Sequence, residues 1–206
     1  MRLWTIQHPH AYEKLIDTGV LTANEDFLFC RDDFRFAYDW MSEKMLEKGI
    51  IPGSEIKYPI WAWYQWRGIR KRLDMRAAGY AERGKKFALL TVEIEDSNVL
   101  LSDVDAFGCC VMNYSYAPLN QNDDEEFERE YERRGVTWDD WRNENVQTNE
   151  VKYIREKVVK SWDRVFEIDI EDDGYLWGQN SEKSIQATFW QLKIDQVIKA
   201  EFFTAK

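Results

Sequence analysis

An alternation of apolar and polar side chains over residues 90–95, within a predicted strand over 86–95, constrains the fold of this chain more than any other feature. Leu90, Val92 and Ile94 share one side of an extended backbone, and polar residues between them share the other. This pattern predicts a strand with one buried face. Further strands are predicted at 2–7, around 61–64, at 99–101, at 185–190 and at 198–203.

Segments with helical spacing separate these strands. We predict a helix over 10–18 that Gly19 ends, a second from Asp32 or Asp33 to Lys48, and a third over 70–83. Strands and helices in this arrangement predict an α+β fold: a single domain spanning 1–206, with a mixed, mostly antiparallel sheet of about six short strands and flanking helices.

Residues 121–150 differ in composition from the rest of the chain. Between Asn122 and Glu150 there are 11 Asp and Glu residues against 4 Arg and Lys residues, a net charge of −7. We predict an acidic helical insertion here, with its charges in solvent. The alternative is a surface that binds a protein partner.

Charge and cysteine usage exclude several classes of function. The net charge of −10, from 28 basic and 38 acidic residues, argues against a generic nucleic-acid binder. The three cysteines form neither a disulfide framework nor a zinc pattern, so we expect a reducing, cytoplasmic location and no structural metal. No apolar run reaches the roughly 20 residues that cross a bilayer, so we expect no membrane association.

Strong catalytic motifs are missing, but one basic segment stands out. The sequence has no phosphate-binding glycine loop, no His-Glu-x-x-His and no nucleophile elbow. Residues 67–86 carry eight Arg and Lys residues against two acidic ones, directly after Trp61, Trp63 and Trp66. Flat rings beside guanidinium groups suit a nucleotide or single-stranded RNA. The alternative is that these arginines pair with the acidic segment.

One carboxylate lies where the predicted strand at 99–101 meets a short helix, which we predict to begin at Ser102 or Asp103 and to end near Met112. Asp103, followed by Asp105, occupies this junction, which is a common position for a binding residue. A helix cap at the same place is the other interpretation, because a carboxylate oxygen accepts from free amides of the first helical turn.

Several strings together resemble a bacterial family of unknown function, family 3841. They span nearly the whole chain apart from the acidic segment: Leu3-Trp4-Thr5-Ile6-Gln7, Gly19-Val20-Leu21, Ala37-Tyr38-Asp39-Trp40-Met41, Tyr58-Pro59-Ile60-Trp61-Ala62-Trp63, Leu100-Leu101-Ser102-Asp103-Val104-Asp105, Ser161-Trp162 and Ile185-Gln186-Ala187-Thr188-Phe189-Trp190. More distantly, the order of first strand, helix ending in Gly-Val-Leu and late Gln-containing strand resembles the ADP-ribosyltransferase superfamily.

The distant resemblance implies NAD as substrate. It assigns roles to residues of the predicted strands at 2–7 and 185–190. Thr5, as a catalytic residue, and Gln7 would orient the nicotinamide amide. Gln186, the second catalytic residue, would bind the ribose hydroxyls. The superfamily commonly has a His or Arg at the first position and a Glu at the last, and an amide stabilises an oxocarbenium ion only through its dipole.

The same resemblance places rings and cations around the cofactor. Tyr38 and Trp61 would stack on the nicotinamide, Trp63 would be a further cofactor contact, and Arg70 and Arg72 would hold the pyrophosphate. Asp103 would be a further cofactor contact. The implied reaction transfers ADP-ribose to protein or nucleic acid. Two alternatives remain open: a non-catalytic nucleotide- or RNA-binding module, and a protein-interaction domain that uses the acidic segment.

Overall fold

The computed structural model describes residues 1–25, 34–53, 55–75, 81–172 and 174–206, and these form two compact units. The sheet unit comprises Met1–Leu101 and Ile185–Lys206, and the helical unit comprises Ser102–Ser184. The helical unit is longer than the predicted insertion at 121–150, and the assignment of one domain with an insertion stays a prediction.

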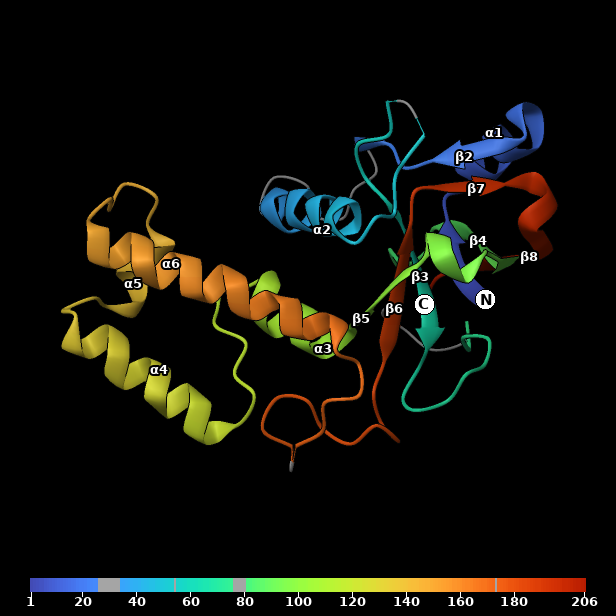
Figure 1. Cartoon of the computed structure of the whole chain (residues 1–206). Helices are drawn as coiled ribbons and strands as arrows, with labels where there is room; N and C mark the ends of the chain where they lie inside the picture. The colour runs from blue at the N-terminus through green and yellow to red at the C-terminus, as the bar shows by residue number, and fades with distance from the viewer. Residues whose placement is uncertain (26–33, 54, 76–80, 173) are drawn as a thin grey trace. The chain divides into compact units, whose positions relative to one another are not determined.

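A six-stranded sheet forms the framework of the sheet unit (Figure 1). Its order is β5-β6-β3-β1-β4-β8, with β5 at Leu100–Asp103, β6 at Ile185–Phe189, β3 at Ile60–Gln65, β1 at Arg2–Gln7, β4 at Lys86–Glu93 and β8 at Val197–Thr204. The pairs β1–β3, β1–β4, β3–β6 and β4–β8 are all antiparallel. The α+β fold with a mostly antiparallel sheet and flanking helices is confirmed.

The sheet buries side chains on both faces. Leu3, Ala62 and Leu90 contribute to a cluster that also contains Leu15 of α1 (Pro9–Thr18), and we call this side the α1 face. Trp4 and Leu89 are the chain neighbours of Leu3 and Leu90 and therefore point to the opposite side of the sheet. There they pack with Leu73, Met75, Trp63 and Trp66. We call that side the tryptophan face. The two faces follow from the period of two along each strand.

Helix α1 and the predicted second helix flank this sheet. Gly19 ends α1 with φ of +77°, a left-handed conformation that glycine adopts without strain, as predicted. Strand β2 (Val20–Thr22) follows and pairs with β7 (Gln191–Lys193) in a small second sheet. Helix α2 spans Arg35–Glu47. Its predicted caps, Asp32 and Asp33, lie outside the described residues.

The predicted helix over 70–83 is wrong in the residues that the structure describes. Residues 70–75 and 81–85 form no helix. A turn with Arg67 at φ +46° and Gly68 at φ +73° precedes them. Leu73 and Met75 are both buried in the tryptophan-face cluster. Their spacing of two residues suits an extended chain, and their burial decided the conformation over the helical propensity of the surrounding residues.

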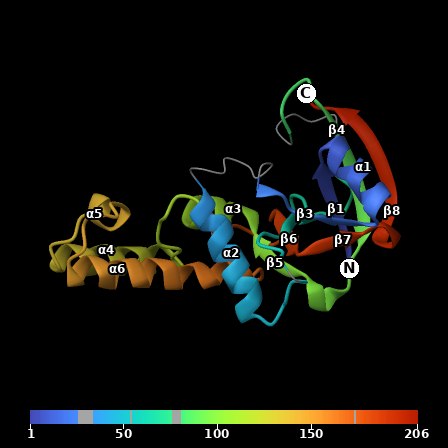
Figure 2. The ribbon, with the colours of Figure 1, turned by 90° about the horizontal axis from the view of Figure 1, so that it is seen from above.

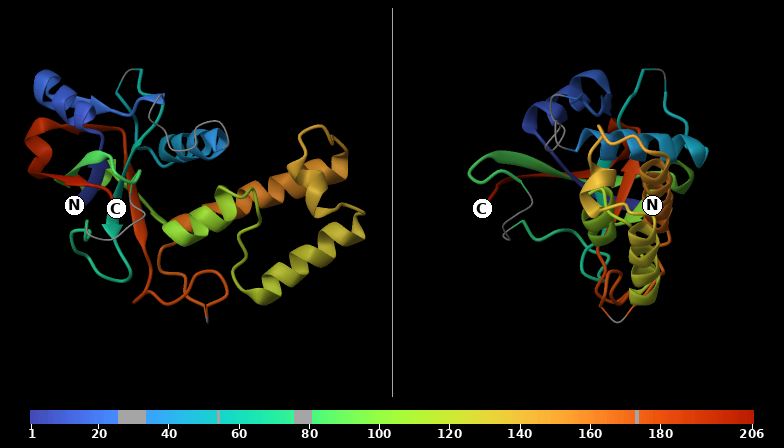
Figure 3. Two further views of the ribbon diagram at one scale, coloured as in Figure 1. Left: turned by 180° about the vertical axis from the view of Figure 1, so that it is seen from behind. Right: turned by 90° about the vertical axis from the view of Figure 1, so that its left-hand side faces the viewer.

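The main helices of the helical unit appear in Figures 1 and 3, and aromatic side chains form a core among them. These helices are α4 (Gln121–Arg133), α5 (Trp138–Arg142) and α6 (Asn149–Ser161), after the short α3 (Val104–Ala106). Phe127 stacks on Tyr116 with ring centroids 4.0 Å apart and contacts Trp141 edge to face at 5.9 Å. The acidic segment therefore supplies buried packing as well as solvated charge. None of the described helices has both the length and the apolar character of a membrane span.

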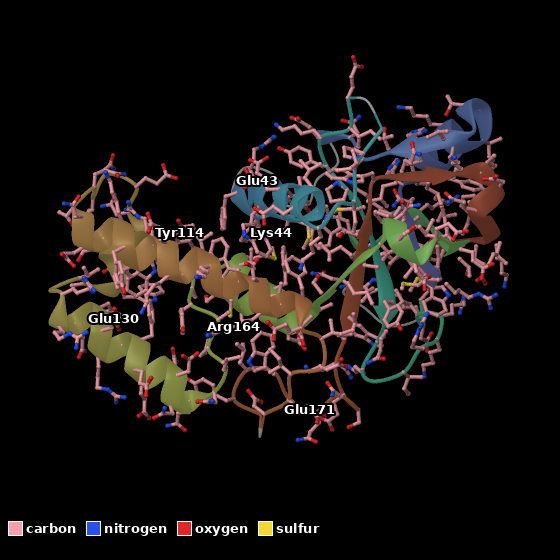
Figure 4. All side chains as sticks on the ribbon, in the orientation of Figure 1. Glu43, Lys44, Tyr114, Glu130, Arg164 and Glu171 are labelled. Atoms are coloured by element: carbon pink, nitrogen blue, oxygen red, sulfur yellow. The ribbon has the colours of Figure 1, made fainter. Side chains whose placement is uncertain are left out.

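Part of the acidic charge is neutralised inside this unit. Glu130, labelled in Figure 4, forms ion pairs with Lys157 and Arg134 and accepts a hydrogen bond from the Tyr153 hydroxyl at 2.9 Å. The hydrogen bond from Lys157 holds the pKa of Glu130 below its ordinary value. Acidic residues of α4 thus hold α4 to α6. An interaction surface for a protein partner stays a prediction for the exposed carboxylates.

A loop in the helical unit is built around one carboxylate. Both oxygens of Asp172 accept backbone N–H bonds, at 2.7–3.0 Å, from Gly174, Tyr175, Leu176, Trp177 and Gly178. These bonds outweigh the cost of burial and lower the pKa of Asp172 to about 2. The ionised carboxylate is therefore the form that the loop requires.

We expect Asp172→Asn to destabilise the protein by about 1 kcal/mol above pH 5, because an amide offers one acceptor oxygen instead of two and solvent screens this loop. The folded pKa of Asp172 lies below the ordinary aspartate value of 3.8, so the carboxylate stabilises the fold above that value and loses its effect as pH falls toward 2. Urea unfolding at a series of pH values measures this. A difference between the two proteins that stays constant from pH 6 to pH 2.5 would contradict the assignment.

Candidate nucleotide site

Three aromatic rings meet where α2 lies against the tryptophan face. Tyr38 of α2 contacts Trp61 of β3 edge to face, with ring centroids 5.9 Å apart, and Tyr58 at 6.0 Å. Tyr58 is 1% exposed, whereas Tyr38 and Trp61 are half-buried. The structure brings together Tyr38 and Trp61, the two rings expected to stack on the nicotinamide.

The hydroxyl of Tyr58 connects a cation to a carboxylate. Arg35 donates to the Tyr58 hydroxyl at 2.9 Å, and that hydroxyl donates to Asp39 at 2.8 Å. Arg35 and Asp39 lie four residues apart on α2, which puts them on one helix face. Sequence reasoning missed all three residues, although Asp39 and Tyr58 lie in the strings that carried the family resemblance. The i,i+4 spacing beside Tyr38 was the available signal.

Two cations of this cluster share one carboxylate. Glu25 forms ion pairs with Arg35 at 3.1 Å and Lys57 at 3.3 Å. The hydrogen bonds from Arg35 and then Lys57 hold the pKa of Glu25 below its ordinary value. The Lys57 ammonium also lies 4.9 Å from the centre of the Tyr58 ring. The geometry stabilises an anion beside the aromatic rings.

Gln186 lies on the same face of the sheet as the tryptophans. Trp63 of β3 is opposite Gln186 of β6, and Trp61 is opposite Thr188. Trp63 is also opposite Trp4 of β1 and packs against Trp66, with centroids 4.8 Å apart. Cross-strand partners share a face, so β3 and β6 present Trp61, Trp63 and Gln186 on one side.

Thr5 and Gln7 lie on the opposite side, the α1 face. Thr5 is fully buried; its hydroxyl donates to the Trp61 carbonyl at 2.7 Å and accepts from the Gln7 amide at 2.8 Å. Trp4, next to Thr5, points to the tryptophan face. The structure therefore does not bring Thr5 and Gln7 to the face that carries Gln186. Strand pairing, which the sequence of β1 alone does not encode, set this arrangement.

Arg70 and Arg72 both interact with other parts of the sheet unit. The Arg70 guanidinium lies 3.6 Å from the centre of the Tyr64 ring and donates to the Arg2 carbonyl at 2.9 Å. Arg72 makes a forked pair with Glu201 at 2.7 and 3.0 Å. This partner lies on β8, not in the acidic segment. A phosphate would have to displace Glu201 from Arg72.

Asp103 is a buried helix cap in the helical unit. Its Oδ1 accepts from the Ala106 amide at 3.0 Å, and its Oδ2 lies 3.6 Å from the Lys183 ammonium, with both side chains almost fully buried. Burial raises the pKa of Asp103, an effect that the Ala106 amide and Lys183 oppose. Lys183 also donates to the carbonyls of Ile168, at 3.1 Å, and Ile170. The capping interpretation of Asp103 is confirmed.

Neither a metal site nor an activated thiol at Cys110 is found in the residues that the structure describes. Over these ranges, no three His, Cys, Asp or Glu side chains converge as a metal site. Burial raises the pKa of Cys110 to about 12, so its thiol is protonated at neutral pH and is a poor nucleophile. The aromatic and cationic cluster around Tyr38, Tyr58 and Trp61 is the stronger candidate for a binding site.

Comparison with known proteins identifies one family. A family model described as "Domain of unknown function (DUF3841)" matches residues 2–198. No curated protein and no solved structure matches the chain.

Proposed function

This chain belongs to the DUF3841 family, and we propose that it binds a nucleotide, with NAD as the first candidate, on the tryptophan face beside Gln186. One observation carries the proposal: Tyr38 contacts Trp61 on the face of β3 and β6 that also carries Trp63 and Gln186. Aromatic rings supply stacking surfaces for a base, and an amide side chain can both donate to and accept from ribose hydroxyls.

The phosphates would be held by Arg35 and Lys57. Both cations pair with the half-exposed Glu25, and both lie beside Tyr58. A phosphate competes for the same N–H groups because it carries more charge and more acceptor oxygens than one carboxylate. This assignment replaces the proposed role of Arg70 and Arg72, whose partners lie elsewhere on the sheet unit.

ADP-ribosyl transfer is the catalytic form of this proposal. The order β6-β3-β1 places the first strand and the late Gln-containing strand on either side of the strand that carries Trp61. Thr5 and Gln7 lie on the other face of the sheet, so this form of the proposal assigns the catalytic role to Gln186 alone. In that reaction the bond between ribose C1′ and the nicotinamide nitrogen breaks, and its electron pair leaves with nicotinamide. An oxygen or nitrogen of a protein or nucleic-acid acceptor then bonds to C1′ and loses its proton. The Gln186 carbonyl would stabilise the oxocarbenium ion by its dipole, so we expect transfer to be slow.

We expect Trp61→Ala to weaken nucleotide binding by roughly fivefold to 150-fold, because loss of base stacking costs about 1–3 kcal/mol. Calorimetric titration of NAD, ADP-ribose, AMP and a short single-stranded RNA measures the affinity. Trp138→Ala is the matched control, since Trp138 is 47% exposed and lies in the helical unit. Wild-type protein that binds none of these ligands at millimolar concentration would eliminate the proposal.

Two further measurements distinguish ADP-ribosyl transfer from non-catalytic binding of a nucleotide or of RNA. Release of nicotinamide from NAD, followed by chromatography with wild type and Gln186→Ala, tests transfer. Binding without release identifies a non-catalytic nucleotide module. Preference for RNA over NAD, with an affinity that falls steeply as salt rises, identifies an RNA-binding module instead.

A further inference from the structure

Strand β8 is an edge strand of the six-stranded sheet. Its only neighbour in the sheet order is β4, and the views in Figures 1 and 2 agree with this. The Ala205 amide donates to the Lys85 carbonyl at 2.9 Å, so Ala205 directs its backbone groups toward the β4 side. Backbone groups alternate along a strand, and residues 200, 202 and 204 therefore direct theirs outward. Within the described ranges, no strand pairs with that outer edge.

Apolar side chains beside this edge are unusually exposed. Phe202 is 62% exposed and Ile198 is 50% exposed, although both belong to the sheet. Phe202 contacts Tyr12 of α1 edge to face, with centroids 5.6 Å apart. An exposed edge strand with large apolar side chains readily pairs with another strand.

The charges of β8 are complementary to themselves. In an antiparallel pair of two β8 strands centred on Ala200, Lys199 lies opposite the partner subunit's Glu201. Ile198 is the extra residue at the register shift of β8 against Thr91 and Val92, and it falls beside the partner subunit's Phe202. The Lys199 side chain is 61% exposed, and its ammonium lies 3.1 Å from Glu201 of its own strand. Opposite charges and apolar pairs directly across two strands both stabilise the pairing.

Backbone geometry and charge select this register over its neighbours. Centring on Ala200 brings the outward backbone groups of residue 200 in both copies face to face, as hydrogen bonding requires. Centring on Glu201 would place two carboxylates opposite each other, and centring on Lys199 would place two ammonium groups opposite each other. If the two-fold axis lay between two consecutive residues, each residue with outward-directed backbone groups would face a residue whose backbone groups point toward β4.

We propose that β8 pairs antiparallel with β8 of a second copy of this chain, around a two-fold axis at Ala200, joining two sheets into one of twelve strands. Many natural edge strands carry a lysine that repels a second strand. Here Lys199 lies opposite the partner subunit's Glu201 in the Ala200 register, so the same lysine favours self-pairing; each Glu201 also keeps its forked pair with Arg72 of its own chain. The self-complementary sequence is what selects a second copy over a strand of another protein.

Sedimentation equilibrium over a concentration series, with the full chain, tests the pairing. Wild type is expected to be a dimer, and Lys199→Glu and Glu201→Lys are each expected to raise the dimer dissociation constant at least tenfold, since each sets like charges opposite each other at two places. Mixing the two variants restores both opposite-charge pairs and is expected to restore the dimer. Circular dichroism of each variant verifies that it folds.

Phe202→Ser tests the apolar part of the same interface, and Ile51→Ser is its matched control, because Ile51 is 69% exposed at another place in the sheet unit. Phe202→Ser is expected to weaken the dimer, whereas Ile51→Ser is expected to leave it unchanged. Wild type that sediments as a monomer at several hundred micromolar overturns the proposal. A dimer unaffected by Lys199→Glu and Phe202→Ser overturns it as well, and failure of the mixed variants to associate overturns the Ala200 register.

Discussion

Asp103→Ala is expected to reduce the free energy of unfolding by about 3–5 kcal/mol, the cost of leaving a buried charge without its partner. Lys183 and Asp103 are 3% and 2% exposed, and their charged atoms lie 3.6 Å apart. The substitution also removes the cap on the Ala106 amide. Urea denaturation followed by tryptophan fluorescence measures the loss.

Two further variants separate charge from capping. Asp103→Asn keeps an acceptor for the Ala106 amide but removes the negative charge. Combining it with Lys183→Met removes both buried charges, and we expect the double variant to be more stable than the sum of the single losses predicts, by at least about 1 kcal/mol. Additive losses would mean that Asp103 and Lys183 contribute independently, contrary to this account.

Trp141→Ala is expected to cost about 3–5 kcal/mol, because it opens a cavity in the aromatic core of the helical unit. Trp141 is 2% exposed and packs against Phe127 and Tyr131, with ring centroids 5.9 and 4.9 Å away. Its carbonyl also accepts from Arg155 at 2.7 Å. Thermal and urea unfolding both report the change.

Trp138→Ala is the control for this variant. Trp138 lies one helical turn earlier, contacts Trp141 at 6.4 Å and stacks with Arg142, but is 47% exposed. We expect it to cost less than about 1 kcal/mol. Equal losses for the two tryptophans would refute a core centred on Trp141. Because Phe127, Tyr131 and Trp141 of this core lie inside 121–150, a deletion of that segment would remove packing together with charge. A test of a protein partner should neutralise exposed carboxylates instead.

The candidate site was only partly visible in the sequence. Tyr38 and Trp61 were expected to share a site and do lie in contact. Thr5 and Gln186 were expected to converge. Thr5 lies on the α1 face, opposite Leu90 of β4, whereas Gln186 lies on the tryptophan face, opposite Trp63 of β3. Each strand shows two alternating sets of side chains, and which set of β1 joins which set of β6 depends on how both strands pair with β3.

The sequence alone predicted the strands β1, β4, β6 and β8, the end of α1 at Gly19 and the helix cap at Asp103. Each of these features depends on residues that are close together in the chain. Tertiary structure alone decided that Leu73 and Met75 lie in an extended segment, that Tyr58 joins Arg35 to Asp39, and that β8 forms the edge of the sheet. These features arise from contacts between residues far apart in the chain, and short-range preference carries no information about which distant residues will meet.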